Sequence, residues 1–336
     1  MKKKISVLLS IIMMLTFALA GCGGQKAEEE TPATEEAKLK VALVVAGGLG
    51  DRSFYDSSNE GFDKAKAELG VEGSVFECKN DPGLYTDQMI NAAQTSDVII
   101  AVGFEFDQTL KEVAPQFPDK KFIYIDNVIE GIDNLTSIDY MENEGAFLAG
   151  ALAALESESG KIGMVGGADI PVIRNFRAGY EAGAKYVNPD VQIEVIFAES
   201  FEDPAKGKES ALALYSKGVD IIFQVAGKTG EGVFEAAKDV NKKAIGVDSD
   251  QRYINPDVIV ASMIKGVGLS VYESLEKIQN GTFESGTVYK YGTNENGVDI
   301  GYGTEDMPQL VSEETKAKIQ ELKEKISSKE ITVPEV

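Results

Sequence analysis

Residues 40–70 read KVALVVAGGLGDRSFYDSSNEGFDKAKAELG. The apolar run at their start predicts a buried β-strand, and the glycines that follow it predict a turn. From residue 57 to residue 69, apolar side chains recur at spacings of three and four, which predicts a helix with one apolar face. Asp56 or Ser57 would cap this helix, and Gly70 would end it. The segment therefore predicts a strand-turn-helix unit.

The same unit recurs along the rest of the chain. Short β-branched runs, each followed by a polar or glycine-rich turn, alternate with helical stretches. Alternation of this kind predicts parallel sheets with helices on both faces. One sheet rarely holds this many strands, so we predict an α/β protein with two doubly wound parallel-sheet lobes of about five or six strands each. The further predicted strands are 74–78, 97–102, 121–125, 161–165, 191–197, 220–223, 243–247 and 258–263.

The start of the chain predicts an export signal. Three lysines precede an apolar run that ends at Leu19 and is too short for a comfortable permanent bilayer crossing. The sequence Leu-Ala-Gly-Cys, residues 19–22, follows as a small-residue cleavage site. We expect residues 1–21 to be a signal peptide, and Cys22 to carry acyl chains that anchor the mature chain on the extracytoplasmic face of the cell membrane. An ordinary cleaved signal and an uncleaved helix are the alternatives.

Composition narrows the classes of function. Residues 22–38 consist mainly of Gly, Ala, Thr, Pro and a run of glutamates, with almost no large apolar side chains, which predicts a flexible lipoprotein tether. Cys78 is the only other cysteine of the mature chain, so an intramolecular disulfide is not expected. Histidine is absent, which removes the commonest general base and zinc ligand, and we expect no metal and no cofactor. The net charge of −22 argues against nucleic acid as a partner.

Polar chemistry gathers where the predicted strands end. In open parallel sheets, ligands bind beyond the carboxyl ends of the strands. These ends combine aromatic rings, carboxylates, a lysine and glycines, a mixture that suits a polyhydroxylated, partly planar small molecule. The segments concerned are 47–55, 103–104, 126–127, 166–167, 226–230, 248–250 and Lys265.

Each of these side chains also has a purely structural explanation. Asp126 and Asp248 could cap the helices that follow them. Lys265 is either exposed or paired with carboxylates, because an unpaired buried charge is costly. Residues 227–232 superficially resemble a phosphate loop but lack its Gly-Lys-Ser/Thr ending, which argues against nucleotide hydrolysis. The aromatic residues that could belong to the core instead are Phe54, Phe104, Phe201 and Phe223.

Several longer segments, spread over the chain after the tether, are together specific for one family. They are GDRSFYD (50–56), EGAFLAG (144–150), KIGMVGG (161–167) with PVI (171–173), SFEDPAK (200–206), FQVAGKTG (223–230), IGVDSDQ (245–251) and SMIK (262–265). Through these segments the chain resembles the basic membrane protein family of lipoproteins, which includes the purine nucleoside receptor of spirochaetes and serves ABC-type nucleoside uptake.

The resemblance implies a fold and a role. The fold is the ribose-binding-protein type, a periplasmic binding protein of type I whose two lobes are joined by three crossings of the chain. Residues 39–137 plus 265–293 would form the first lobe, and residues 138–264 plus 294–336 the second. The implied role is that of a monomeric solute-binding protein, not an enzyme, which captures a nucleoside of the purine type and delivers it to an ABC permease.

The resemblance also implies roles for single residues. Phe54 would stack on the base, with Phe201 or Phe223 as its counterpart across the cleft. Asp248 and Lys265 would bind the ribose hydroxyls, and Gly227 would let the backbone approach the ligand closely. Asp126 and Asp51 would be further carboxylates at the edge of the first lobe. The full set of predicted ligand-binding residues is Asp51, Phe54, Tyr55, Phe104, Asp126, Phe201, Phe223, Gly227, Asp248 and Lys265.

Tyr55 departs from the family pattern, in which asparagine often follows the Ser-Phe pair. Adjacent aromatic residues are closer to the pattern of sugar-binding relatives, so a ribose-like sugar or another nucleoside is the alternative ligand. Two other classes stay open on the residues alone. One is a glycosidase or nucleosidase that uses paired carboxylates, although the sequence marks no such pair. The other is a surface sensor or adhesin that uses the same pocket to signal.

Overall fold

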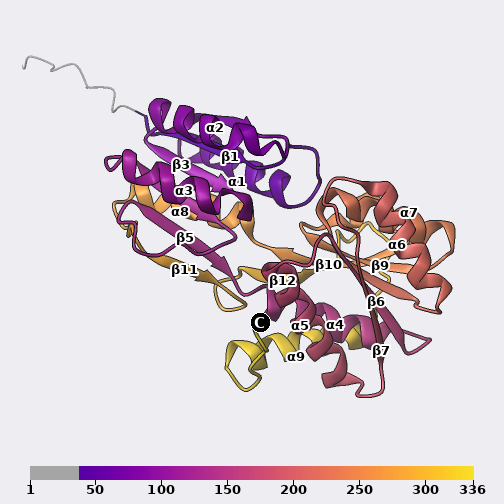
Figure 1. Cartoon of the computed structure of the whole chain (residues 1–336). Helices are drawn as coiled ribbons and strands as arrows, with labels where there is room; N and C mark the ends of the chain where they lie inside the picture. Colours follow the sequence, from indigo (N-terminus) through magenta and orange to yellow (C-terminus); the bar gives the residue numbers. More distant parts are fainter. Residues whose placement is uncertain (1–37) are drawn as a thin grey trace, which may run out of the picture. The chain divides into compact units, whose positions relative to one another are not determined.

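The computed structural model describes residues 38–336. The predicted signal peptide, Cys22 and all of the predicted tether except Lys38 lie outside these residues. The described chain contains two six-stranded sheets with helices on both faces (Figure 1), which confirms the predicted α/β class and its two doubly wound lobes. Among the described helices, none has the length and apolar character that crossing a membrane requires.

The first sheet is parallel throughout and has the strand order β11-β5-β4-β3-β1-β2. Its inner strand β3 is buried at every position, because helices cover both faces, and such strands are continuous apolar runs in the sequence. The strands are β1 (Lys40–Val45), β2 (Glu72–Glu77), β3 (Val98–Val102), β4 (Lys121–Ile125), β5 (Leu135–Tyr140) and β11 (Val288–Tyr291).

The second sheet has the order β12-β10-β9-β8-β6-β7 and repeats the arrangement of the first. Only its edge strand β12, which pairs with β10, is antiparallel within this sheet. The strands are β6 (Lys161–Gly166), β7 (Gln192–Phe197), β8 (Ile221–Val225), β9 (Lys243–Asp248), β10 (Ile259–Lys265) and β12 (Val298–Gly301).

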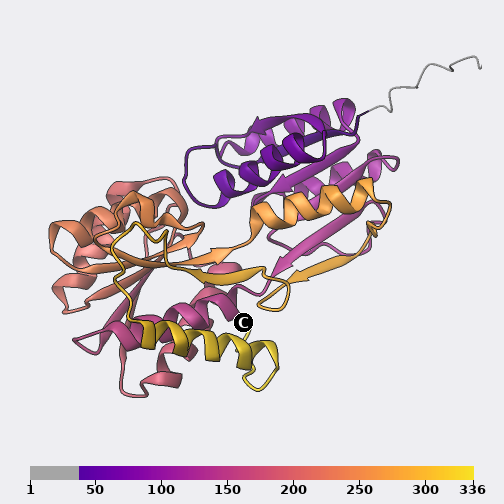
Figure 2. The same cartoon turned by 180° about the vertical axis from the view of Figure 1, so that it is seen from behind.

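Helices cover both faces of each sheet and close four apolar cores. On the first sheet, α1 (Phe54–Glu68) and α8 (Val267–Gln279) cover one face, and α2 (Pro82–Thr95) and α3 (Asp107–Val113) cover the other. On the second sheet, α4 (Glu142–Glu156), α5 (Pro171–Val187) and α9 (Glu313–Ser327) lie on one face, with α6 (Pro204–Ser216) and α7 (Gly230–Asp239) on the other. Figure 2 shows α9, in yellow, alongside α4. Short 3-10 turns are η1 (Phe104–Phe106), η2 (Ala114–Gln116), η3 (Gly227–Thr229) and η4 (Gln251–Ile254).

The chain passes between the two sheets three times. Met141 links β5 to α4, Gly266 links β10 to α8, and residues 292–297 link β11 to β12. Two of these passages lie a few residues away from the boundaries expected from the sequence.

The first boundary was expected after residue 137, but β5 continues in the first sheet to Tyr140, which pairs with Tyr291. The second was expected before Lys265, but Lys265 pairs with Val298 in the second sheet. Backbone hydrogen bonds to a neighbouring strand set both limits, and those partners are distant in sequence. We therefore propose that the lobes change at Met141 and Gly266.

Helix α1 begins at Phe54, earlier than the predicted start at residue 57. Its N-cap residue, Ser53, makes no side-chain capping bond. The carboxylate of Asp51 does this instead and accepts hydrogen bonds from the backbone N–H groups of Ser53, Tyr55 and Asp56 at 3.1, 2.9 and 3.0 Å. Because this acceptor precedes the N-cap position, the usual capping pattern in the sequence does not reveal it.

Candidate functional site

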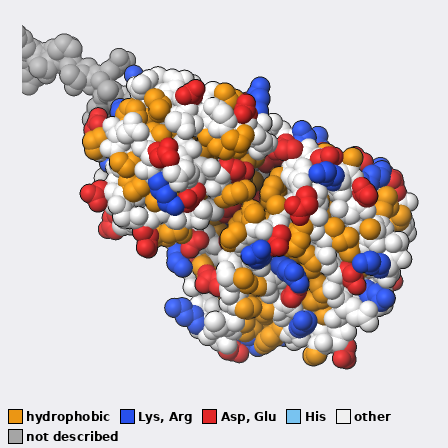
Figure 3. Space-filling view, viewed as in Figure 1, with side chains coloured by type: hydrophobic (Ala, Val, Ile, Leu, Met, Phe, Trp, Pro, Cys, Tyr) orange, Lys and Arg blue, Asp and Glu red, His pale blue; other side chains and the backbone are white. Residues whose placement is uncertain are grey.

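A cleft lies where the carboxyl ends of strands from both sheets meet, the place where open parallel sheets bind ligands. It encloses about 640 Å³ when the open space at its mouth is included. Figure 3 shows hydrophobic side chains gathered along the hollow on this face. Of the predicted ligand-binding residues, those that line the cleft are Asp51, Phe54, Tyr55, Phe104, Asp126, Phe201, Gly227, Asp248 and Lys265.

Phe223 does not reach the cleft, and the expectation that it faces the ligand does not match its position. It is fully buried in the middle of β8, where its ring centroid lies 5.4 Å from that of Tyr180 and 6.3 Å from that of Phe176. Strand β8 continues to Val225, beyond the predicted end at residue 223. Phe223 is therefore a core residue, and Phe201 is the predicted counterpart that lines the cleft.

Aromatic rings approach the cleft from both lobes. Phe104 of the first lobe and Phe201 of the second have ring centroids 6.5 Å apart. Deeper in the cleft, the ammonium group of Lys265 lies 5.3 Å from the ring centroid of Phe54 and 5.5 Å from that of Phe176. These distances are within the range of cation–π attraction. The cleft therefore offers flat apolar surfaces beside a buried positive charge.

Asp126 and Asp248 occupy equivalent positions in the two lobes. Asp126 directly follows β4 and Asp248 ends β9, and both have left-handed backbone conformations with φ of +79° and +66°. Neither caps a helix, because Asp126 forms an ion pair with Lys265 and Asp248 accepts a hydrogen bond from Ser53. The capping alternative for these residues is therefore excluded. Both carboxylates point into the same cleft.

Lys265 is buried and paired with carboxylates. Of the two possibilities raised by the sequence, exposure or pairing, the second is therefore correct. The Lys265 side chain is 2% exposed and that of its partner Asp126 is 12% exposed. Burial by itself would lower the pKa of Lys265, but the charges of Asp126, Glu142 and Asp248 outweigh it and raise that pKa. Burial raises the pKa of Asp126, and the Lys265 charge opposes this only in part. The site thus holds a cation with several carboxyl oxygens around it.

Asp51 lines the cleft, but its carboxylate already accepts the three backbone hydrogen bonds that begin α1. Burial raises the pKa of Asp51 to about 6, although these hydrogen bonds favour its charged form. Tyr55 is also largely committed to structure, because its ring packs on Gly47, where an added Cβ would lie 2.4 Å from the ring. Both residues shape the cleft wall more than they present free polar groups.

Sequence reasoning missed several residues that line the cleft. Glu105 directly follows Phe104, Glu202 directly follows Phe201, and Lys228 lies in the strand-end segment 226–230. Burial raises the pKa of Glu105 to about 7, and its Oε2 atom has no hydrogen-bond partner within residues 38–336. In the sequence, each of these three residues is adjacent to a predicted ligand-binding residue, and this adjacency could have identified them.

Most of the missed apolar residues come from the start of α5, and Val225 and Val247 come from β8 and β9. Ile170, Val172, Ile173 and Phe176 all line the cleft. The segment PVI was recognised as part of the family pattern, but a helix start gives no sign in the sequence of which side chains face a ligand.

The family model described as ABC transporter substrate-binding protein PnrA-like (Bmp) matches residues 38–336. The chain belongs to the Bmp family. The ABC transporter nucleoside-binding protein BmpA of Lactococcus lactis subsp. cremoris is 34% identical over 313 residues, which cover 87% of this chain and 89% of the relative. Basic membrane protein A of Borreliella burgdorferi is 35% identical over 335 residues, with 97% and 95% covered. The predicted family resemblance is confirmed.

A solved structure agrees with the fold of this Bmp chain. The ABC transporter system solute-binding protein from Aeropyrum pernix K1 superposes with a TM-score of 0.80 at 29% identity, and the match covers 89% of this chain and 94% of that one. Bmp proteins are substrate-binding proteins of ABC transporters. The role of the family is therefore binding, not catalysis, as the resemblance implied.

Proposed function

We propose that this Bmp protein is the membrane-anchored solute-binding component of an ABC importer, that its ligand is a purine nucleoside, and that it delivers this nucleoside to the permease. The protein works as a monomer whose lobes close over the ligand. Cys22 carries the lipid anchor and residues 22–38 form the tether. The BmpA relative, which is named as a nucleoside-binding protein, supports the ligand class.

The observation that carries this proposal is the pairing of aromatic rings with a buried polar cluster in one cleft. A ribose offers adjacent hydroxyls that can donate to the carboxylates of Asp126 and Asp248 and accept from Lys265. The base offers a flat π-surface for Phe54 and Phe201. Neither half of a nucleoside alone would use both sets of groups.

The carboxylates serve binding and not bond cleavage in this proposal. Asp126 forms an ion pair with Lys265 and Asp248 accepts from Ser53, so both are engaged as hydrogen-bonding groups. Gly227, with φ of +54°, adopts the left-handed conformation at the start of η3 and brings backbone to the cleft wall without a side chain.

A thermal-shift panel tests the ligand class. A ligand that binds only the folded state stabilises it by about 2.7 kcal/mol at a concentration one hundred times its Kd. We expect guanosine, inosine or adenosine to raise the melting temperature, and free ribose or free bases to do much less. A large shift with ribose and none with any nucleoside would show a sugar-binding protein. Release of free base from an incubated nucleoside would show a nucleosidase.

The transport role is tested separately in cells. Deletion of the gene in a nucleoside-auxotrophic strain should abolish growth on low concentrations of the nucleoside that stabilises the purified protein. Growth equal to that of the parent strain would favour a sensor or adhesin that uses the same cleft.

A further inference from the structure

Direct hydrogen bonds join the two lobes at one edge of the cleft. The backbone carbonyl of Arg52, in the loop before α1, accepts from Gln251 Nε2 at 2.9 Å and from Ser249 Oγ at 3.2 Å. The next residue, Ser53, donates its hydroxyl to Asp248 Oδ2. Ser53 is fully buried and Asp248 is 7% exposed, so this contact is shielded from water. Two adjacent residues of the first lobe thus contact the turn 248–251 of the second.

The loop of the first lobe is held in one conformation by two carboxylates. Asp56 accepts from the backbone N–H groups of Gly50 and Arg52 at 2.7 and 2.9 Å. Asp51 accepts from the N–H of Ser53 at 3.1 Å. Arg52 itself has φ of +51°, a left-handed conformation that a non-glycine residue keeps only when its surroundings impose it. The Ser53 hydroxyl is therefore presented from a rigid support.

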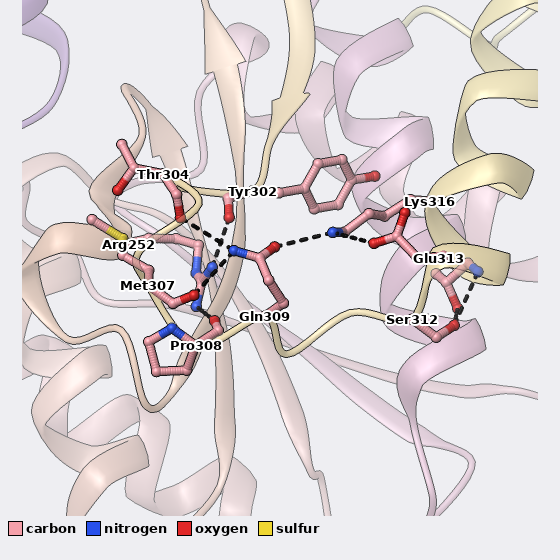
Figure 4. A network of polar contacts seen from close by, with 10 residues as sticks. Arg252, Tyr302, Thr304, Met307, Pro308, Gln309, Ser312, Glu313 and Lys316 are labelled. Atoms are coloured by element: carbon pink, nitrogen blue, oxygen red, sulfur yellow. Dashed lines mark hydrogen bonds and ion pairs between the residues drawn. The ribbon is translucent and has the colours of Figure 1, made fainter.

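The turn of the second lobe is equally fixed. Gln251 Oε1 accepts from the backbone N–H of Val247 at 2.9 Å and from Gln224 Nε2 at 2.7 Å, so only its Nε2 group points to the first lobe. Behind it, the buried guanidinium of Arg252 donates to backbone carbonyls of Ile259 and Tyr302 at 2.7 and 2.6 Å. Figure 4 shows Arg252 tied in this way to the loop that includes Pro308 and Gln309.

We propose that Ser53 is a positioning residue for Asp248, supplied from the opposite lobe. Its hydroxyl donates a hydrogen bond to Oδ2 of the Asp248 carboxylate. This fixes the carboxylate so that Oδ1 can accept from a hydroxyl of the bound molecule. The hydrogen bonds of the Arg52 carbonyl with Gln251 and Ser249 bring the Ser53 hydroxyl to Asp248. The ligand-binding carboxylate of the second lobe is therefore oriented by a residue of the first lobe.

The proposal rests on the proposed function for the identity of the ligand, but its central contact is testable without one. Asp248 faces Ser53, Lys265 and Asp126. Burial raises the pKa of Asp248, and the Lys265 charge and the Ser53 hydrogen bond oppose that rise. Loss of the Ser53 hydroxyl should therefore raise the pKa of Asp248 further in the ligand-free protein.

The experiment compares Ser53→Ala with Ser58→Ala on the full chain. Ser58 is a matched control, because it is also fully buried, but its hydroxyl donates within α1 to the carbonyl of Tyr55 at 2.7 Å. Carboxyl ¹³C NMR titration with labelled aspartate reports the pKa of Asp248 in each variant. We expect a higher Asp248 pKa in Ser53→Ala and an unchanged one in Ser58→Ala.

Binding of inosine supplies the second measurement. The lost hydrogen bond should weaken inosine binding about two- to tenfold in Ser53→Ala, and the loss should begin at a higher pH on acidification than in the parent protein. Ser58→Ala should bind as the parent does. An Asp248 pKa that is unchanged in a folded Ser53→Ala variant overturns the proposal. A parent protein that binds no nucleoside would count against the proposed function alone, since the NMR result stands without ligand.

Discussion

Phe54 and Phe223 have the same side chain but different roles in this protein. Phe54, partly buried at the first position of α1, lines the cleft beside Lys265. Phe223 is fully buried in the middle of β8 between the rings of α5. One ring therefore offers a free face to a ligand, and the other uses both faces for packing.

Substitution of each phenylalanine by alanine should separate these purposes. Phe54→Ala should lower nucleoside affinity by about 1–3 kcal/mol, the usual value of base stacking on an aromatic ring, with little change in the free energy of unfolding. Phe223→Ala should lower the free energy of unfolding by about 3–5 kcal/mol through the cavity that it leaves. Calorimetric titration and urea denaturation measure the two effects. If both variants lowered nucleoside affinity equally, Phe223 would have to be part of the binding site.

Glu105 is a carboxyl group whose surroundings disfavour its charge. It lines the cleft, one of its oxygens is buried without a hydrogen-bond partner in the described chain, and burial raises its pKa to about 7. A carboxyl with a raised pKa stabilises the folded state fully below its ordinary pKa and loses that contribution as the pH rises through its folded value. The relevant window is therefore about pH 4.5 to 7.

Glu105→Gln should remove this pH dependence. Relative to the parent protein, the variant should gain on the order of 2 kcal/mol of unfolding free energy between pH 5 and pH 8, because the parent alone must ionise a buried carboxyl. Denaturation curves at the two pH values measure the difference. Glu112→Gln, at an exposed position of α3, serves as the control and should differ from the parent equally at both values. An identical pattern for both variants would refute the burial argument.

At the scale of elements, backbone contact between α4 and α5 determines how these helices pack. Gly179 and Gly183 of α5 face the backbone of α4, and an added Cβ would lie 2.1 Å from the Asn143 carbonyl oxygen and 1.9 Å from that of Phe147. Gly150 of α4 faces Tyr180 in the same way. No side chain fits at these points unless the helices separate. The start of the same helix, α5, lines the cleft.

Gly183→Ala should therefore be destabilising although alanine favours helices. The added methyl group meets backbone that cannot rotate away, and overpacking of this kind costs about 1–3 kcal/mol or more. Lys185→Ala, at an exposed position of the same helix, should change the free energy of unfolding by less than about 0.5 kcal/mol. Urea denaturation of both variants decides. A stabilised Gly183→Ala variant would mean that the two helices can move apart freely.

At the scale of the whole molecule, three passages of the chain bring two equivalent strand ends together. Asp126 and Asp248 come from different sheets, and Lys265 ends the strand that precedes the second passage. Asp126 meets the lysine only when both lobes are in place, whereas Asp248 and Lys265 belong to neighbouring strands of the second sheet. Movement of one lobe against the other therefore changes the electrostatics of the cleft directly.

The proposed anchor belongs to the same scale, because it determines where this binding protein works. Cys22→Ala should release the protein from membranes or leave it as an uncleaved precursor, since no acyl chain can be attached. Fractionation of cells that express the parent and the variant measures this. A variant that is processed normally and stays bound to the membrane to the same extent as the parent would show a different anchor.

The sequence by itself was enough for the class of fold, because hydrophobic periodicity is a local property. The nine strands predicted from it all exist, within a few residues of their expected ends. Strand β5 and the edge strands β11 and β12 were not predicted, and both edge strands pair with partners distant in sequence. The rule that ligands bind at strand ends, together with the family pattern, located nine of the ten proposed site residues in the cleft.

Tertiary structure decided what those residues face. The carboxylate of Asp51 accepts hydrogen bonds from the backbone at the start of α1, and Phe223 is buried in the core. Ser53 contacts Asp248 across the cleft. These outcomes depend on the exact end of a strand or on a partner almost two hundred residues away, as with the 195-residue separation of Ser53 and Asp248. Hydrophobic periodicity contains no information about such pairs, because they form only when the two sheets meet.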